Sequence, residues 1–323
     1  MDVVGADMPS SERPRLLITG ATGFVGRHLV DYLRHRNLAL RVQVHDQKPP
    51  SEWSDLERVH GSLADWSDFG KWVEGVDYVI HAAADTDVTG AVKSPERSLQ
   101  LNCLATMHLL DEFRDSPVKR FVYLSSARIY GRVQYLPIDE RHPYFVEDPY
   151  GASKLAGGLY VDLYHRLYGI PTVNLVVFSV YGRGQRPHGN TGVAAIFCRK
   201  VVEGEDITIL GDGSLRRDLI HVRDVCRAVE LSLNSSKAIG ETYNVATGVG
   251  TTMLSLAQRV LDIGRQCGFK GTKIRYADPL PGDVSNTADV TKIRKHLGFE
   301  PEVALDEGIR EYIVWYAKQK ALA

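Results

Sequence analysis

The chain has 323 residues, 44% of them apolar, and its 39 lysines and arginines against 40 aspartates and glutamates give a net charge of −1. This length suits one large α/β unit or two domains of about 150 residues. The balanced charge gives no general attraction to nucleic acid or to anionic membranes. No stretch approaches the ~18 apolar residues of a membrane span, and the polar start lacks the core of a signal peptide, so we expect a cytoplasmic protein. The cysteine spacing fits neither a disulfide framework nor a zinc site, which predicts reduced thiols at Cys103, Cys198, Cys226 and Cys267.

The first half of the chain alternates short apolar runs with helical patterns, which predicts a parallel sheet wound with helices. We expect strands over residues 16–19, 40–44, 77–81, 118–125 and 172–178. We expect helices over residues 23–36, 94–113 and 149–168. Pro95 suits a first helical turn, and Gly169 suits a helix end.

Beyond Tyr181 the composition shifts to Gly, Arg, Pro and His, which predicts a loop over residues 182–192. Shorter elements follow, with helices expected over 193–202, 222–233, 253–266 and 305–318, and strands over 207–209 and 242–245. The sequence therefore predicts a nucleotide-binding domain over residues 1–181. Residues 182–323 are expected to form mainly a smaller lobe, with some segments returning to the first domain. The cleft between the two is the expected ligand site.

A glycine pattern follows the first strand and opens a helix, with glycines at positions 20, 23 and 26. Glycines let the backbone approach a pyrophosphate, whose charge is stabilised by the free N–H groups of the helix N-terminus. Such a pattern alone is often only a tight turn, but a strand before it and a helix after it favour dinucleotide binding. Asp46 lies 20 residues after Gly26. A carboxylate there would bind the adenosine ribose and repel a 2′-phosphate, which favours NAD over NADP, whereas the alternative is a solvated turn aspartate.

A second constellation joins Ser126, at a strand end, to Tyr150 and Lys154 near the start of a helix. Tyr150 and Lys154 are four residues apart and share one helical face. A tyrosine of pKa about 10 is a poor base, but the positive charges of a nearby lysine and an oxidised nicotinamide would lower that pKa towards 7. A serine hydroxyl opposite would hold the substrate oxygen. The tyrosine and lysine alone could be surface residues, and it is their combination with Ser126 and the glycine turn that indicates catalysis.

With these motifs the chain resembles the extended short-chain dehydrogenase/reductase superfamily, in its NAD-dependent epimerase/dehydratase branch acting on nucleotide sugars. The resemblance runs from about Arg15 to Tyr316 and includes residues 81–84, 126–131, 178–182, 211–222 and 281–284. It implies a Rossmann-like α/β fold, a doubly wound parallel sheet with a smaller C-terminal α/β substrate lobe. It also implies that Ser126, Tyr150 and Lys154 are catalytic.

The resemblance further implies two sets of binding residues. The NAD contacts would be Tyr150, Lys154, Gly20, Gly23, Phe24, Val25, Gly26, Asp46, Ser62, Leu63, Ala82, Ala83, Ala84 and Asn102. The nucleotide-sugar contacts would be Thr86, Ser126, Ser179, Arg186, Arg217 and Asp283. Arg217 would grip the diphosphate, for which a bidentate guanidinium is suited, whereas the alternative is a surface salt bridge with Asp218.

Departures from the family pattern narrow the expected function. Ala127 and Arg128 stand where dehydratases carry acidic residues, which disfavours elimination of water. Ser62 and Ser179 replace a usual aspartate and asparagine. Leu280 replaces a second diphosphate-binding arginine, for which Arg275 is a candidate substitute.

We therefore expect a nucleotide-sugar 4-epimerase with tightly bound NAD, acting on a UDP-hexose or UDP-hexuronate. A 4-ketoreductase or dehydrogenase, a dehydratase, and a noncatalytic NAD-sensing module remain alternatives, the last opposed by the intact catalytic set. Ser179 and residues 181–187 resemble uronate 4-epimerases, in which an arginine after glutamine reaches the substrate carboxylate. Arg186 takes that place here, although residues 188–190 depart from the pattern.

Two further expectations concern metals and assembly. His81, His188 and His221 are expected to be structural or loop residues, so no metal site is predicted. Relatives form homodimers through helices matching residues 95–113 and 149–168, with leucines here at 101, 104, 109, 159, 163 and 167. Core packing explains these leucines equally well. Tyr160, Tyr164 and Tyr168 recur at helical spacing and are expected to form a packing or dimer face.

Overall fold

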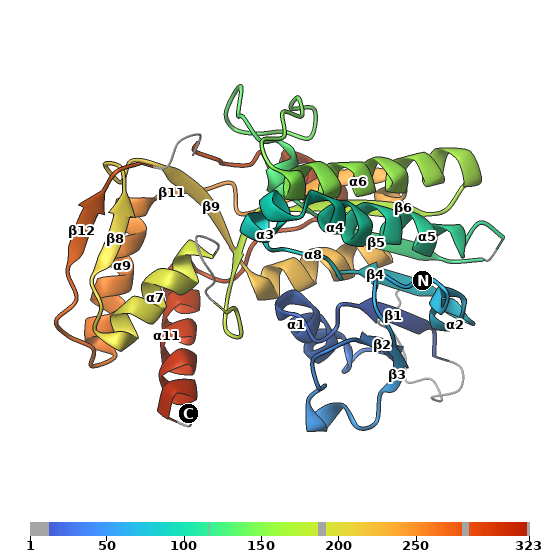
Figure 1. Cartoon of the computed structure of the whole chain (residues 1–323), viewed down its shortest axis with the longest axis horizontal. Coiled ribbons are helices and arrows are strands. Elements are labelled where there is room, and N and C mark those ends of the chain that lie inside the picture. Colours follow the sequence, from blue (N-terminus) through green and yellow to red (C-terminus); the bar gives the residue numbers. More distant parts are fainter. Residues whose placement is uncertain (1–12, 116, 187–191, 280–283, 322–323) are drawn as a thin grey trace.

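A seven-stranded, fully parallel sheet forms the larger part of the protein, in a computed structural model that describes residues 13–115, 117–186, 192–279 and 284–321. The strand order is β10-β6-β5-β4-β1-β2-β3 (Figure 1). The strands are β1 (Arg15–Thr19), β2 (Ala39–Val44), β3 (Glu57–His60), β4 (Tyr78–His81), β5 (Arg120–Ser126), β6 (Thr172–Val177) and β10 (Glu241–Val245). This is the predicted doubly wound, Rossmann-like arrangement.

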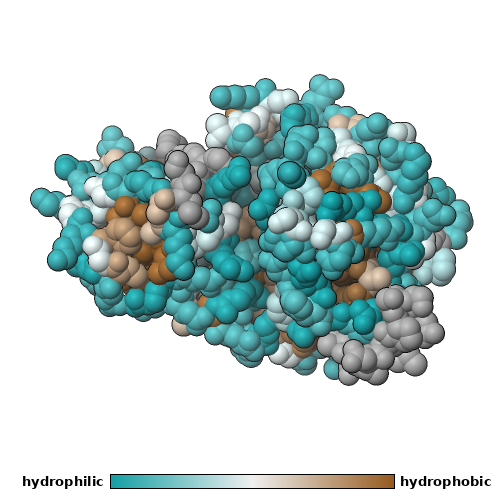
Figure 2. Space-filling view, turned by 90° about the horizontal axis from the view of Figure 1, so that it is seen from below, coloured by the Kyte–Doolittle hydropathy of each residue, from teal (hydrophilic) through white to brown (hydrophobic). Residues whose placement is uncertain are grey.

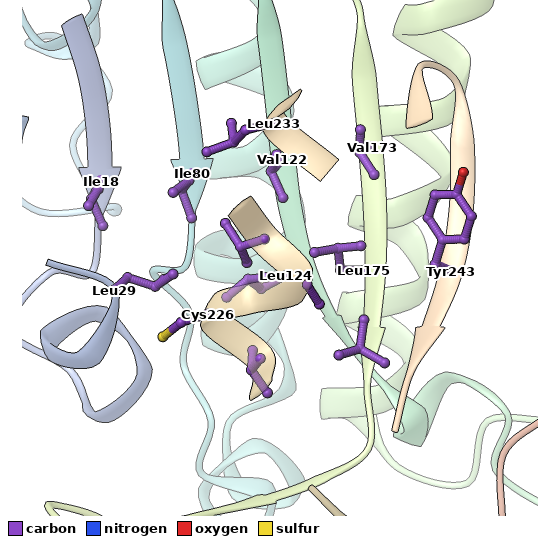
Figure 3. Packing of buried hydrophobic residues seen from close by; sticks show 14 of the residues in the cluster. Ile18, Leu29, Ile80, Val122, Leu124, Val173, Leu175, Cys226, Leu233 and Tyr243 are labelled. Atoms are coloured by element: carbon purple, nitrogen blue, oxygen red, sulfur yellow. The ribbon is translucent and has the colours of Figure 1, made fainter. Parts of the chain in front are cut away.

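Helices cover both faces of this sheet. They are α1 (Phe24–Leu33), α2 (Phe69–Val73), α3 (Val88–Lys93), α4 (Pro95–Leu99), α5 (Ala105–Asp111), α6 (Pro149–Tyr168), α8 (Val222–Asn234) and α10 (Thr291–Leu297). Helices α1 and α8 pack on one face, where Leu29, Cys226 and Leu233 meet the strand residues Ile80, Val122 and Leu175 (Figure 3). Helices α5 and α6 pack on the opposite face through Leu109 and Val161. Burial of apolar surface on both sides holds the sheet between two helical layers.

The remaining elements form a smaller lobe, at the left of Figure 1. They are β7 (Ser179–Tyr181), β8 (Ile207–Leu210), β9 (Arg216–His221), β11 (Gly250–Thr252), β12 (Ile274–Ala277), α7 (Val193–Glu203), α9 (Met253–Gln266) and α11 (Leu305–Ala321). One three-stranded sheet has the order β11-β9-β7, and β12 pairs with β8. Helices α7, α9 and α11 share a separate core around Phe197, Leu256 and Ile309.

The second half of the chain also completes the larger sheet. Strand β10 pairs with β6, and α8 packs against α1. Segments after residue 181 therefore belong to both parts of the molecule. The boundary at residue 181 stays a prediction.

Several elements differ from the expected ones. The helix expected over 23–36 ends at Leu33, and the helix expected over 94–113 contains a π-helical segment at Gln100–Leu104 between α4 and α5. Strand β3 was not predicted because it is an edge strand with a largely exposed sequence, which leaves no apolar alternation to detect. Six other elements were not predicted because each has only three to seven residues, too few to show a clear periodicity. They are strands β7, β11 and β12 and helices α2, α3 and α10.

The face seen from below is largely hydrophilic, with apolar groups visible in separate places (Figure 2). Among the helices of the described ranges, none is long and apolar enough to cross a membrane.

Candidate active site

The predicted site residues gather at the carboxyl ends of the parallel strands. The strand order reverses between β1 and β4, and such a reversal leaves a crevice at the strand ends where ligands bind. Gly20 follows β1, the alanines at 82–84 follow β4, and Ser126 ends β5. The fold therefore brings motifs from distant parts of the sequence to one edge.

The glycine turn has little room for side chains. Gly20 has φ +67°, and a Cβ atom on it would lie 2.6 Å from the Cα atom of Ala83. A Cβ atom on Gly26 would collide with the carbonyl oxygen of Gly20. Helix α1 starts directly after Gly23, which makes no side-chain cap, so the amides of the first turn, including those of Phe24 and Val25, remain available to an anion. This cradle fits the diphosphate of a dinucleotide.

The expected adenosine side lies beyond β2 and β3. Asp46 follows β2, and its side chain is 84% exposed, with one carboxylate oxygen 3.2 Å from Nε2 of His45. Ser62 follows β3, and its hydroxyl accepts a hydrogen bond from the amide of Ala64, whereas Leu63 is buried. An exposed carboxylate at the end of β2 is in the right place to accept hydrogen bonds from a ribose.

Helix α6 places Tyr150 and Lys154 beside the end of β5. Asp148 caps the helix by accepting a hydrogen bond from the amide of Gly151 at 2.7 Å, and Gly169 ends it with φ +69°. Burial raises the pKa of Tyr150, while a hydrogen bond with Ser126 and the charge of Arg128 lower it. Ser126 and Tyr150 are thus near enough for the serine hydroxyl to lower the pKa of the phenol.

Lys154 is a buried amine. Its Nζ atom lies 4.1 Å from the centroid of the Tyr123 ring, and burial lowers its pKa to about 7. A lysine with this pKa can carry a proton or release it near neutral pH.

Asn102 lies behind the site rather than on its surface. Its side chain is buried, accepts a hydrogen bond from the amide of Asp85, and donates to the carbonyl of Asp85 and the hydroxyl of Ser153. Ser153 in turn donates to the carbonyl of Tyr150 at 2.8 Å and contacts the hydroxyl of Ser98. Asn102 therefore ties the loop after β4 to helix α6, which carries Tyr150 and Lys154. Ser98 and Ser153 were missed because a buried serine leaves no distinctive sequence signal.

A second buried chain of hydrogen bonds passes through His81. The Thr106 hydroxyl donates its single proton to the Asn102 carbonyl, so it accepts from Nε2 of His81. Nδ1 of His81 then accepts from the Thr19 hydroxyl at 2.7 Å. Burial, with a contribution from Lys154, lowers the pKa of His81 to about 3, so the ring is neutral.

His81 thus has the structural role predicted for it. His221 is also buried at the start of α8, and its Nδ1 accepts from the amide of Arg223. Within the described ranges, no three His, Cys, Asp or Glu side chains form a possible metal site. His188 lies outside those ranges.

The expected sugar contacts are more dispersed. Ser179 opens β7, Thr86 is exposed in the loop after β4, and Arg186 is exposed after β7. Arg217 lies on β9 and donates to the carbonyl of Val284 at 2.5 Å. Asp283 and Leu280 lie outside the described residues.

The alternative role for Arg217, a surface salt bridge with Asp218, is wrong because Asp218 is fully buried. Its carboxylate accepts hydrogen bonds from Thr247, Gly248 and Ala288. Arg275, the candidate substitute for a second diphosphate arginine, pairs with Asp206 at 2.5 Å.

The leucines and tyrosines considered for an interface divide into two groups. Leu109 is fully buried in the core, so it is not part of a free face. Tyr164 is also buried and donates to Asp111 at 2.6 Å. Leu159 and Leu167 on α6 are 54% and 63% exposed.

Comparison with known proteins agrees with this geometry. The fold and the site are those of a dinucleotide-binding enzyme. Residues 16–246 match the model of the NAD dependent epimerase/dehydratase family. Because the match covers most of the chain, the chain belongs to this family, and its cofactor is NAD.

Two curated relatives show the range of activities in the family. A putative UDP-glucose 4-epimerase of Methanocaldococcus jannaschii is 34% identical over 308 residues, covering 93% of this chain and 97% of the relative. A dTDP-glucose 4,6-dehydratase of Streptomyces niveus is 31% identical, covering 95% and 94%.

Two solved structures share the whole fold. The UDP-glucose 4-epimerase of Thermotoga maritima, solved with UDP-glucose, has a TM-score of 0.86 at 31% identity, covering 96% of this chain and 100% of that one. The UDP-glucuronic acid 4-epimerase of Bacillus cereus, solved with UDP-glucuronic acid and NAD, has a TM-score of 0.83 at 25% identity, covering 94% and 99%.

Proposed function

We propose that this protein is an NAD-dependent nucleotide-sugar 4-epimerase. The observation that carries the proposal is that Ser126 ends β5 at the strand edge that also bears the glycine turn, and that α6, which carries Tyr150 and Lys154, packs against β5. Family membership and the similarity to UDP-sugar 4-epimerases support it.

In this mechanism Tyr150 takes the proton of the C4 hydroxyl of the sugar, and Ser126 holds the C4 oxygen. Bound NAD would supply the hydride acceptor and donor at C4. Burial raises the pKa of Tyr150 and favours the protonated phenol, whereas Ser126 and Arg128 lower that pKa and favour the phenolate, which is the form that can accept a proton. Lys154 would hold the nicotinamide ribose. Rotation of the resulting 4-keto sugar would turn its other face to the nicotinamide. Return of the hydride to C4 on that face, with the proton given back to the C4 oxygen by Tyr150, would invert C4 without net oxidation or reduction.

The residues after Ser126 favour epimerisation over dehydration. Ala127 offers no acid, and Arg128 pairs with Asp148 at 3.1 Å. Loss of water from the hexose needs a group that protonates the leaving hydroxyl. Positions 127 and 128 supply no carboxyl group for that role.

A substrate panel tests the proposal. UDP-, dTDP-, GDP- and CDP-sugars are incubated with the enzyme, and proton NMR follows inversion at C4. We expect inversion without stoichiometric change in NADH. A net change in NADH would indicate a reductase or dehydrogenase, a 4-keto-6-deoxy product would indicate a dehydratase, and NAD binding without turnover of any sugar would indicate a sensing module.

The substrate we propose is a UDP-hexuronate such as UDP-glucuronate. Arg186 follows Gln185, whose side chain donates to the carbonyl of Val180 at 3.1 Å and whose carbonyl accepts from the Tyr312 hydroxyl at 2.8 Å. These bonds fix the backbone next to an exposed guanidinium, which can bind a carboxylate through two hydrogen bonds. The similarity to the Bacillus cereus UDP-glucuronic acid 4-epimerase supports this choice. In the panel, UDP-glucuronate should exceed UDP-glucose in kcat/KM, and the reverse order would contradict it.

We also propose that the chain forms a homodimer through α4, α5 and α6. The exposed leucines at 99, 159 and 167 on α4 and α6 supply apolar area for such an interface. Sedimentation at micromolar protein concentration should give the mass of two chains. A monomeric mass would refute the proposal.

A further inference from the structure

Gln43 is a polar side chain inside a buried strand. Strand β2 is buried from Leu40 to Val44, and Gln43 is only 3% exposed. A buried amide is costly unless its hydrogen bonds are made, so its partners indicate what it does.

Both ends of the Gln43 amide bind backbone groups. Oε1 accepts a hydrogen bond from the amide of Gly20 at 2.8 Å. Nε2 donates to the carbonyl of Gly61 at 2.7 Å. Because one partner is a donor and the other an acceptor, the orientation of the amide is fixed.

The two partners belong to the two turns that flank the end of β2. Gly20 opens the glycine turn after β1, and Gly61 follows β3 and leads into Ser62 and Leu63. Both glycines have positive φ, +67° and +149°, and both are closely packed. A Cβ atom on Gly61 would lie 2.7 Å from the Trp72 ring. One side chain therefore spans two rigid turns.

We propose that Gln43 is a positioning residue for the adenosine half of NAD. It sets the spacing between the turn that receives the diphosphate and the turn that lies beside the adenine. The inference rests on the proposed placement of NAD at the glycine turn. It concerns how the site is held, since Gln43 itself is too buried to contact the cofactor.

The test measures binding rather than turnover. Gln43→Met keeps the length of the side chain and removes both hydrogen bonds. Gln43→Asn keeps the amide but is too short to reach both turns. Equilibrium constants are measured for NAD, ADP-ribose and nicotinamide mononucleotide, together with the melting temperature of each variant.

We expect Gln43→Met to raise the Kd of NAD and of ADP-ribose by the same factor, about tenfold or more, and Gln43→Asn to raise both by a smaller factor. The Kd of nicotinamide mononucleotide should change less than twofold, and kcat at saturating NAD should stay near the wild-type value. Asn174→Met is the matched control, because Asn174 is also a buried strand amide but lies on β6. It should leave the Kd of NAD unchanged even if it lowers the melting temperature.

Two results would overturn the inference: a Kd for NAD within twofold of wild type in both Gln43 variants, or an equal loss for nicotinamide mononucleotide. Failure of the proposed epimerase activity would appear separately, as absent turnover in the wild-type enzyme whose NAD binding still depends on Gln43.

Discussion

The cofactor side and the sugar side of this protein are built differently. On the cofactor side the predicted residues lie at strand ends of one parallel sheet, and the backbone itself forms the cradle, as Gly20 and Gly26 show. On the sugar side the expected contacts Ser179, Arg186 and Arg217 lie on β7, in the loop after it and on β9, and they would act through their side chains. A site made by backbone geometry is recognisable in the sequence and shared across a family, whereas a site made by exposed side chains sets the choice of substrate.

Removing the phenol hydroxyl at the junction of the two sides should have the largest effect. We expect Tyr150→Phe to lower kcat by about 10³-fold or more, because the general base is lost. NAD and nucleotide binding should stay within a few-fold of wild type. Activity is measured by the NMR assay, with Tyr160→Phe on the same helix as control. Near-normal turnover in Tyr150→Phe would rule out the mechanism.

The second largest effect should follow from placing a methyl group in the glycine turn. Gly26→Ala places a methyl group against the Gly20 carbonyl, so the turn must shift. We expect NAD affinity to fall by about a hundredfold, as measured by titration calorimetry. In Gly70→Ala, the control on α2, the new methyl group meets only the end of the Glu112 side chain, at 3.3 Å. Unchanged NAD affinity in Gly26→Ala would show that the cofactor binds elsewhere.

A change on the sugar side should alter selectivity more than chemistry. We expect Arg186→Ala to lower kcat/KM for UDP-glucuronate about tenfold or more and to leave that for UDP-glucose nearly unchanged. Arg183→Ala, in the same loop but paired with Glu311 at 3.6 Å, is the control. An equal loss on both substrates would mean that Arg186 does not read the carboxylate.

The smallest effect should follow a change at Asp46, a proposed cofactor contact whose side chain is exposed. Asp46→Ala should weaken NAD binding several-fold and relax discrimination against NADP about tenfold, because a ribose acceptor and a repulsive charge are both lost. The ratio of the two Kd values is the measurement, and Gln47→Ala is the neighbouring control. If the ratio does not change, another group reads the ribose.

The contrast between backbone geometry and side-chain contacts also explains which features could be predicted from the sequence. The strand, turn and helix around Gly20 and the helix carrying Tyr150 follow from periodicity and caps, and they agree with the structure closely. The NAD contact expected for Asn102 stays a prediction. Its hydrogen bonds to Asp85 and Ser153 could not be predicted, because a motif gives a residue's neighbourhood and not the direction of its side chain. Gln43 gave no signal at all, since a single polar residue in an apolar strand acquires its meaning only from the two turns that the fold brings beside it.

The pairing of β10 with β6 affects how the protein can be made. Residues that form α7, β8, β9 and α8 separate these two strands in the chain. During synthesis, β6 therefore remains an open sheet edge until residue 245 has left the ribosome, and open edges invite association with other chains. The cofactor-binding sheet is thus finished only after part of the sugar lobe already exists, so the nascent chain cannot complete one half before it begins the other.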